Sequence, residues 1–248
     1  MPDDDDRIAA LEGELAAERE ARARAEAELE QFAYRVSHDL HEPLRTITAF
    51  AGLIERRHAE ALEGDAAEFL GFIVGGARRM QEMINGLLAY SRAGSLEPGD
   101  DPVDVAAAVD HALRGLRERV QETQAAVEVA PELPRVRGSE PALTDVFARL
   151  LSNALTFTRE GAAPRVRVSA GETGGEWCFA VADEGVGLDA GQRERAFEAF
   201  SRLHARDDHD GAGMGLAISR RIVERHGGRI WAEANEPAGC VVRFTLPR

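Results

Sequence analysis

The sequence predicts two kinds of architecture in one chain, long paired helices followed by a two-layer α/β sandwich. Apolar residues recur at helical spacing up to residue 90, and the stretch AGSLEPGDDP then interrupts every periodicity with glycine, proline and acids. Helical and strand-like patterns mix after it. We therefore expect an N-terminal coiled coil over residues 1–31, a helical hairpin over 32–92, a linker over 93–102 and an α/β domain over 103–248.

The first segment fits a heptad repeat that starts at Ile8. Seven of the nine a and d positions are apolar; the nine are Ile8, Leu11, Leu15, Glu18, Arg22, Ala25, Leu29, Phe32 and Val36. A lone helix would leave this stripe in water, although a solvated single helix remains the alternative. The pattern favours a coiled coil with a weakened centre.

The hairpin consists of a helix that reaches Arg57 or Leu62, a turn at EGD (63–65) and a second helix. Apolar residues of the second helix alternate in steps of four and three: Phe69, Ile73, Gly76, Met80, Met83, Leu87 and Tyr90. A hairpin buries only one face of each helix by itself. We expect a homodimer in which two hairpins close a four-helix bundle.

Alternating helices and strands fill the last domain. We expect helices over 104–121, 140–158 and 213–226, and strands over 125–130, 134–138, 164–171, 176–183, 229–235 and 239–246. Segments such as PRVRVSA and GCVVRFTL alternate polar with apolar residues, which is typical of a sheet with one covered and one wet face.

Composition excludes several classes of function. The 248 residues contain 44 acids against 30 bases, and the net charge of −14 would repel nucleic acids and anionic lipids. Cys178 and Cys240 lie in apolar surroundings without metal-ligand spacing, so we expect small strand residues there. No apolar run reaches the roughly 20 residues of a membrane span, and MPDDDDRI lacks the features of a secretory signal, so we expect a soluble, cytoplasmic chain.

One stretch of the first helix, AYRVSHDLHEPLRTI (33–47), concentrates reactive side chains. The heptad places His38 off the apolar seam, where a nucleophile is reachable. Helical spacing favours Glu42, one turn later, as the group that faces His38. Pro43 removes a backbone N–H and is expected to kink the helix, whereas His41 is expected to have no chemical role.

Two glycine clusters in the α/β domain indicate a nucleotide site. In VADEGVGLD, Asp183 ends a strand and can accept a hydrogen bond from an amino group such as that of adenine, while Gly185 and Gly187 allow close backbone approach. The segment DGAGMGLAISRRIVERHGG places three glycines before an amphipathic helix, an arrangement that favours phosphate; they are Gly211, Gly213 and Gly215. Each cluster alone is also explained by an ordinary turn.

Two further segments complete this site. In RERAFEAFSRLHARDDHD, Phe197 and Phe200 are expected to pin the root of a loop that closes over the nucleotide, with ordinary core packing as the alternative. In RLLSNALTFT, one helix face carries Arg149, Asn153 and either Thr156 or Phe157. The Asn153 carbonyl suits Mg²⁺ that carries nucleotide phosphates, unless the amide caps or bridges backbone.

Taken in order, these segments resemble the motifs of sensor histidine kinase transmitters. SHDLHEPLR resembles the H box, LLSNALTFT the N box, DEGVG the G1 box, AFEAF the F box and GAGMGLA the G2 box. The resemblance covers residues 32–247. Details such as SRLHARDD and IVERHGGRIW are most similar to the phytochrome-linked branch of this family.

The resemblance implies an ATP-dependent protein-histidine kinase of a two-component system. His38 would be autophosphorylated and would pass the phosphoryl group to an aspartate of a response regulator receiver domain. Asp39 would hold or accept the ring proton, with Glu42 as a second contact, and an upstream sensor module would supply the signal. The implied ATP-binding residues are Asn153, which also binds Mg²⁺, Phe157, Asp183, Gly185, Gly187, Phe197, Phe200, Arg202, Gly211, Gly213, Gly215 and Leu216.

The N box departs from the family pattern at two positions. Arg149 stands where the family usually has Asn, and Thr156 stands where it usually has Lys. A missing lysine removes a charge-assisted contact of about 1–3 kcal/mol from the phosphates, and Arg149, Arg202 and Arg206 are candidates to replace it.

These departures keep another function open, a non-catalytic dimeric phosphotransfer adaptor with a degenerate ATP domain. An ATP-driven clamp related to chaperones or topoisomerases would leave the H box unexplained.

Overall fold

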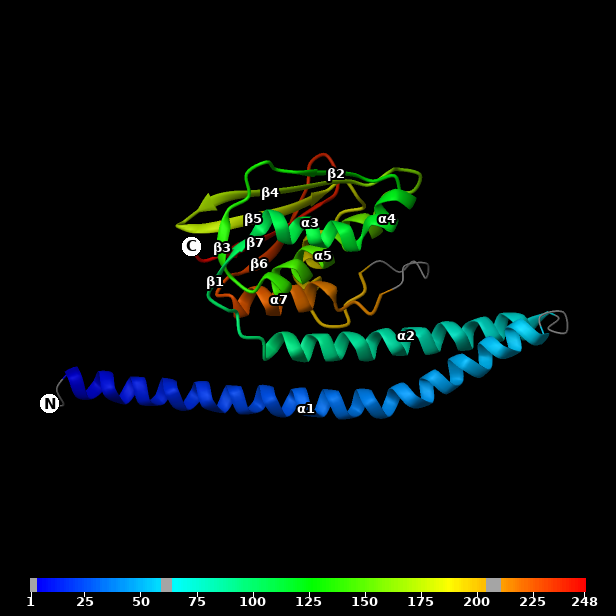
Figure 1. The fold of residues 1–248 in the computed structure, drawn as a ribbon, viewed down its shortest axis with the longest axis horizontal. Helices are drawn as coiled ribbons and strands as arrows, with labels where there is room; N and C mark the ends of the chain where they lie inside the picture. The colour runs from blue at the N-terminus through cyan, green and yellow to red at the C-terminus, as the bar shows by residue number, and fades with distance from the viewer. Residues whose placement is uncertain (1–3, 59–63, 204–210) are drawn as a thin grey trace. The chain divides into compact units, whose positions relative to one another are not determined.

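The computed structural model describes residues 4–58, 64–203 and 211–248 (Figure 1). The chain divides into two compact units, residues 1–95 and 96–248, each with its own core. None of the helices in the described part of the chain has both the length and the apolar character of a membrane span.

The first unit is a hairpin of two long helices, α1 (Asp4–His58) and α2 (Asp65–Gly94), which run side by side (Figure 1). Leu44 of α1 packs with Ala77 and Ile84 of α2 in a small buried cluster. Gly64 precedes α2 with φ of 56°, a left-handed conformation that glycine adopts without strain. The expected pair of helices is therefore present, and α1 runs without interruption through the predicted coiled-coil segment.

Pro43 lies inside α1, where it cannot donate the backbone hydrogen bond that the carbonyl of Asp39 would otherwise accept. Figure 1 shows that α1 bends past the middle of its length. The carbonyl of Asp39, the residue next to His38, thus lacks its helical hydrogen-bond donor, and the helix that carries both residues is bent.

The second unit is a two-layer sandwich. Its helices are α3 (Val105–Gly115), α4 (Arg117–Glu122), α5 (Glu140–Thr156), α6 (Ala190–Arg195) and α7 (Gly215–Arg225). Its strands are β1 (Asp101–Asp104), β2 (Ala126–Val129), β3 (Arg135–Gly138), β4 (Arg165–Thr173), β5 (Glu176–Asp183), β6 (Ile230–Ala234) and β7 (Cys240–Leu246). The main sheet has the order β2-β4-β5-β7-β6, with β2 parallel to β4 and the other pairs antiparallel. Helices α3, α5 and α7 cover one face of it (Figure 1).

Three fully buried rings join the layers. Phe147 of α5 lies 6.1 Å from Phe179 of β5 and 5.4 Å from Phe244 of β7, measured between ring centroids. On β4, Val166 and Val168 are buried whereas Arg165 and Arg167, which alternate with them, are exposed. In β4 the alternation therefore marks one covered and one wet face, as the sequence predicts. Strand β7 contradicts the same expectation for GCVVRFTL: six of its seven residues are buried, so both faces of this inner strand between β5 and β6 are covered. Both cysteines are free and lie in strands, also as expected.

Three elements differ from the sequence-based expectation. The single helix expected over 104–121 is broken at Leu116, directly after Gly115, because glycine propagates a helix poorly. Strand β1, which pairs with β3, is not among the expected strands, because a four-residue segment is too short to show an alternation of polar and apolar residues. Helix α6 has six residues and begins with a capping box between Asp189 and Gln192, a signal that the sequence does contain.

Candidate functional site

His38 stands on the exposed surface of α1 beside a carboxylate. Its Nδ1 lies 3.2 Å from Oδ1 of Asp39, and the two side chains are 73% and 82% exposed. When Nδ1–H donates to this carboxylate, Nε2 carries the free lone pair of the neutral imidazole. The arrangement presents an accessible nitrogen nucleophile whose tautomer is set by its neighbour.

The contacts of Glu42 and His41 differ from those that helical spacing predicts. Within the described ranges Glu42 makes no hydrogen bond to His38, so the partner is Asp39 and not the acid one turn later. His41 has a structural contact that the sequence did not reveal, because its Nε2 lies 3.1 Å from Oδ1 of Asn85 on α2. This hydrogen bond links the two helices of the hairpin one turn from the nucleophile.

Asp183 ends β5 and is held by backbone donors. Its Oδ1 accepts hydrogen bonds from the N–H groups of Gly185 at 2.8 Å and Cys240 at 3.2 Å. Burial raises the pKa of this carboxyl, while the two N–H donors act in the opposite direction. The second oxygen, Oδ2, has no hydrogen-bond donor among the residues that the structure describes, so it is free to accept from a ligand amine.

The loop after β5 is pressed against the end of α5. The N–H of Val186 donates to the carbonyl of Phe157 at 3.0 Å, and a Cβ at Gly185 would collide with that same carbonyl. Gly187 has φ of 70°, and a Cβ there would lie 2.9 Å from the carbonyl of Gly239. Both glycines are therefore required by close backbone approach, which brings Asp183 and Phe157 to one edge of the sheet.

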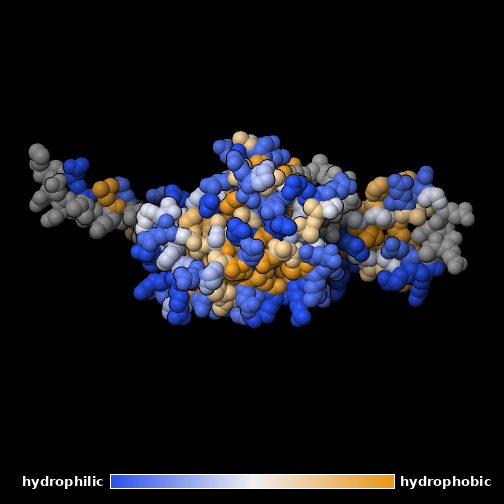
Figure 2. All heavy atoms as spheres, turned by 90° about the horizontal axis from the view of Figure 1, so that it is seen from above, coloured by the Kyte–Doolittle hydropathy of each residue, from blue (hydrophilic) through white to orange (hydrophobic). Residues whose placement is uncertain are grey.

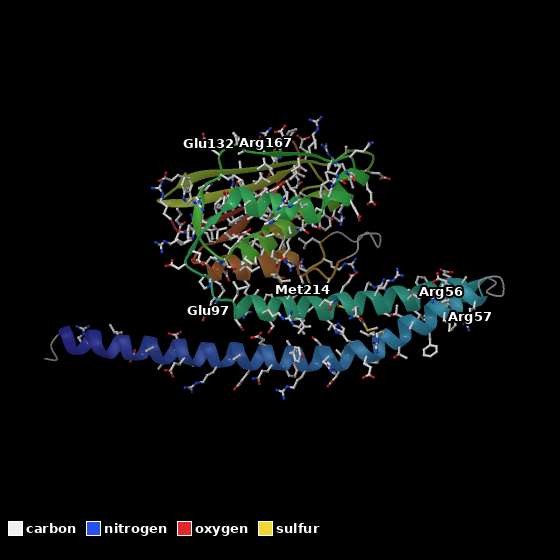
Figure 3. The ribbon with its side chains drawn as sticks, viewed as in Figure 1. Arg56, Arg57, Glu97, Glu132, Arg167 and Met214 are labelled. Atoms are coloured by element: carbon white, nitrogen blue, oxygen red, sulfur yellow. The ribbon has the colours of Figure 1, made fainter. Side chains whose placement is uncertain are left out.

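Asn153 of α5 lies at the N-terminal end of α7. Its amide atoms are 3.8 and 3.9 Å from the position that a Cβ of Gly215 would occupy. Among described residues this amide makes no hydrogen bond, so a purely structural cap or bridge does not explain it. Gly215 and Leu216 open α7, directly after the buried Met214 (Figure 3), and N–H groups of this first turn have no helical acceptor.

In the segment between α6 and α7, the expected role of Phe200 is wrong. Phe197 is 7% exposed and packs into the core, as predicted, but Phe200 is 45% exposed and does not pin the loop. Its backbone is left-handed, with φ of 62°, and the loop ends meet through the main chain instead. A Cβ at Gly213 would lie 2.6 Å from the carbonyl of Ser201.

The cationic residues expected near the phosphates have different environments. Arg149 pairs with Asp145 one turn earlier, with Nε 3.0 Å from Oδ2, so its charge is already neutralised on its own helix. Arg202 is exposed, and Arg206 falls outside the described residues. Among the predicted glycines of the phosphate segment, Gly211 has open space around its α-carbon.

The hydroxyl of Thr156 has a cationic neighbour from another helix. It accepts a hydrogen bond from Nη2 of Arg119 on α4 at 2.7 Å and donates to the carbonyl of Ser152 at 2.6 Å. No local pattern predicts this role for Arg119, because it lies 37 residues before its partner.

A helical hairpin with an exposed histidine, followed by a sandwich with a carboxylate, a free amide and a helix N-terminus at one edge, defines a protein of the histidine kinase class. Residues 28–96 match the family described as His Kinase A (phospho-acceptor) domain. Residues 138–248 match the Histidine kinase-, DNA gyrase B-, and HSP90-like ATPase family. The chain therefore belongs to the sensor histidine kinase transmitters.

Curated relatives agree with the expected branch. The chain is 41% identical to cyanobacterial phytochrome A of Nostoc sp. (strain PCC 7120) over 224 aligned residues. This alignment covers 90% of this chain and 29% of the phytochrome. It is 38% identical over 224 residues to the phytochrome-like protein Cph1 of Synechocystis sp. (strain PCC 6803), covering 90% of this chain and 30% of Cph1. The chain thus spans less than a third of the length of these two relatives.

Solved structures share the fold. Full-length ShkA in complex with AMPPNP superposes with a TM-score of 0.65 at 25% identity, over 88% of this chain and 46% of ShkA. The mycobacterial sensor histidine kinase MprB gives 0.52 at 28% identity, over 60% of this chain and 97% of MprB. ThkA in complex with the response regulator TrrA gives 0.61 at 20% identity, over 94% of this chain and 65% of ThkA, a likeness of fold alone. The predicted fold class is confirmed.

Proposed function

We propose that this chain autophosphorylates His38 with ATP and passes the phosphoryl group to an aspartate of a response regulator receiver domain. The observation that carries the proposal is the exposed His38–Asp39 pair, because it presents a neutral ring nitrogen in a chain that also holds a nucleotide-binding edge. ShkA was solved with AMPPNP and ThkA with a response regulator, which supports the same pair of ligands here.

The nucleotide is bound by groups of complementary chemistry. Oδ2 of Asp183 accepts from the exocyclic amine of adenine, while Oδ1 stays bonded to the backbone. N–H groups at the start of α7 bind phosphate oxygens. The glycines that flank these groups allow the flat base and the phosphates to approach the main chain.

Mg²⁺ fits this site with Asn153 as its protein ligand. Among described residues no group of three or more His, Cys, Asp or Glu side chains is placed to hold a metal. An ion bound here would take its remaining ligands from phosphate oxygens and water, which is the usual arrangement for nucleotide-bound magnesium. Its chemistry is to neutralise charge on the phosphates.

His38 acts as the nucleophile. Nε2 attacks the γ-phosphorus in line, the N–P bond forms, and the bond from phosphorus to the bridging oxygen breaks with its electrons going to ADP. The ring keeps its Nδ1 proton and gains positive charge, which the carboxylate of Asp39 stabilises at 3.2 Å. A receiver aspartate then attacks phosphorus, and the neutral imidazole returns.

The proposed unit of function is a homodimer. The hairpin exposes large apolar side chains on both helices; they include Leu40, Ile47, Phe50 and Ile54 of α1 and Phe69, Phe72, Ile73, Met80 and Met83 of α2. Figure 2 shows hydrophobic surface on the part of the hairpin beside residues 59–63. A second hairpin would cover this surface and complete a four-helix bundle.

The test is labelling with γ-labelled ATP and Mg²⁺, followed by acid and base treatment. We expect an acid-labile, base-stable label that His38→Ala abolishes, and unchanged ATP binding in that variant, because nucleophile and nucleotide groups belong to different units. His41→Ala is the matched control and should keep the label. ATP binding without any label would favour the non-catalytic adaptor.

A further inference from the structure

Arg119 of α4 is held at the nucleotide-binding edge by a neutral hydroxyl. Its Nη2 donates to Oγ1 of Thr156 at 2.7 Å, and Thr156 sits one helical turn after Asn153 on α5. Residues three apart share a helix face, so the contact with Thr156 brings the guanidinium group to the face of α5 that carries Asn153. We propose that Arg119 is a phosphate-binding residue for ATP, an inference that rests on the proposed function.

The charge of Arg119 has no counterion in the described structure. Arg149 is neutralised by Asp145, and Nε of Arg159 donates to the carbonyl of Glu184 at 3.1 Å. No carboxylate in the described ranges lies within ion-pair distance of Arg119. Its guanidinium group carries five N–H donors, of which Thr156 occupies one, so the others are available for the bidentate contact that phosphate favours.

Thr156 and Arg119 act as a matched pair. The hydroxyl proton of Thr156 is bonded to the carbonyl of Ser152, so its oxygen faces Arg119 as an acceptor. A long cationic side chain at position 156 would take this space and repel the guanidinium group. The small residue at 156 therefore admits a cation from α4, and the site keeps a positive charge despite its altered N box.

Removing this charge should weaken binding of the phosphates and not of the nucleoside. In the full chain we expect Arg119→Gln to weaken Mg·ATP binding roughly ten-fold by calorimetry, which corresponds to about 1.4 kcal/mol. Binding of adenosine, followed by ligand-observed NMR, should not change. Arg117→Gln, which removes the same charge from the same exposed helix, is the control and should bind ATP as the wild type does.

A rescue experiment separates phosphate binding from simple packing of α4. Thr156→Lys should restore ATP affinity to Arg119→Gln, because it returns a cation to the same edge, but should add little to the wild type. The ratio of ATP to adenosine affinity is internal to each protein, so partial unfolding would not mimic the effect.

The outcomes distinguish this inference from the proposed function. A wild-type chain that does not bind Mg·ATP would overturn the proposed function. A wild type that binds ATP, with equal affinities in Arg119→Gln and Arg117→Gln, would overturn only the role of Arg119.

Discussion

At the scale of single residues, Asp183 shows a conflict between stability and function. Because burial raises its pKa, the folded protein binds this proton more tightly than the unfolded chain does. The stability that this proton contributes is present below the ordinary pKa of an aspartic acid and is lost as pH rises through the raised pKa of the folded state. At neutral pH the ionised carboxylate thus lowers the stability of the folded protein, which is consistent with a side chain kept for the proposed nucleotide binding.

We therefore expect Asp183→Asn to leave the thermal unfolding temperature at pH 7 unchanged or higher, while ATP binding weakens at least ten-fold, roughly 1.4 kcal/mol. The new amide can still accept from the Gly185 and Cys240 N–H groups, but its NH₂ would face the adenine amine, donor against donor. Inosine triphosphate, which carries an acceptor at that position, should lose less affinity than ATP. Asp101→Asn, on the exposed edge strand β1, is the control. A variant with full ATP affinity would contradict the assignment of the adenine partner.

Residues with local signals were predictable, and residues with distant partners were not. Asp183 and Asn153 stand at motif positions whose chemistry is readable within a few neighbours. The bonds from Arg119 to Thr156 and from His41 to Asn85 span 37 and 44 residues, so only the fold brings their atoms together. For Phe200 the aromatic side chain predicts core packing, whereas the structure leaves it 45% exposed at a position whose backbone is left-handed, a conformation that the residue type does not reveal.

At the scale of elements, the contact between α5 and the loop after β5 depends on the absence of a side chain. Gly185→Ala would place a Cβ against the carbonyl of Phe157 and displace the Val186 N–H bond. We expect this variant to fold with reduced stability, by about 1–3 kcal/mol, and to bind ATP at least ten-fold more weakly. Gly171→Ala in β4, where a Cβ meets nothing within 4 Å, should change neither quantity. Denaturant unfolding and ATP titration of both variants provide the comparison.

Pro43 is the corresponding feature of α1. Replacing it by alanine returns the N–H that the carbonyl of Asp39 lacks, so we expect Pro43→Ala to raise the unfolding temperature, with a gain of up to about 3 kcal/mol. Straightening α1 beside His38 should also change the rate of label incorporation, with ATP binding unaffected. Circular dichroism melts and initial labelling rates measure the two effects. An unchanged melting temperature would show that the bend is imposed by packing and not by proline.

The element pattern was predictable wherever periodicity extended over several turns or strands. The long helices α1, α2, α5 and α7 and the strands β4, β5 and β7 have such patterns. The break between α3 and α4 follows Gly115, a local signal that apolar periodicity does not include. The pairing of β1 with β3 joins two four-residue strands, which are too short for periodicity to report.

At the scale of the whole molecule, the decisive feature is the hairpin's uncovered apolar surface. Phe69 and Ile73 are 58% and 52% exposed, although their spacing marks them as seam positions. Covering a large apolar side chain contributes about 1.5–3 kcal/mol, so four such residues per dimer approach the roughly 8 kcal/mol of a micromolar association. We expect light scattering at micromolar concentration to report about twice the chain mass of 26.9 kDa.

The matched variants test whether that surface is the interface. The double variant Phe69→Glu, Ile73→Glu should be a monomer of 26.9 kDa, because the free-energy cost of burying the carboxylates in a bundle exceeds the free energy gained from the apolar contact. Arg78→Glu, an exposed residue on the polar side of the same helix, should remain dimeric. ATP binding should persist in all three proteins, since the nucleotide groups lie in the second unit and the substitutions in the first. A wild-type monomer at micromolar concentration would exclude the bundle, and an unaltered dimer in the double variant would place the interface on another face of the hairpin.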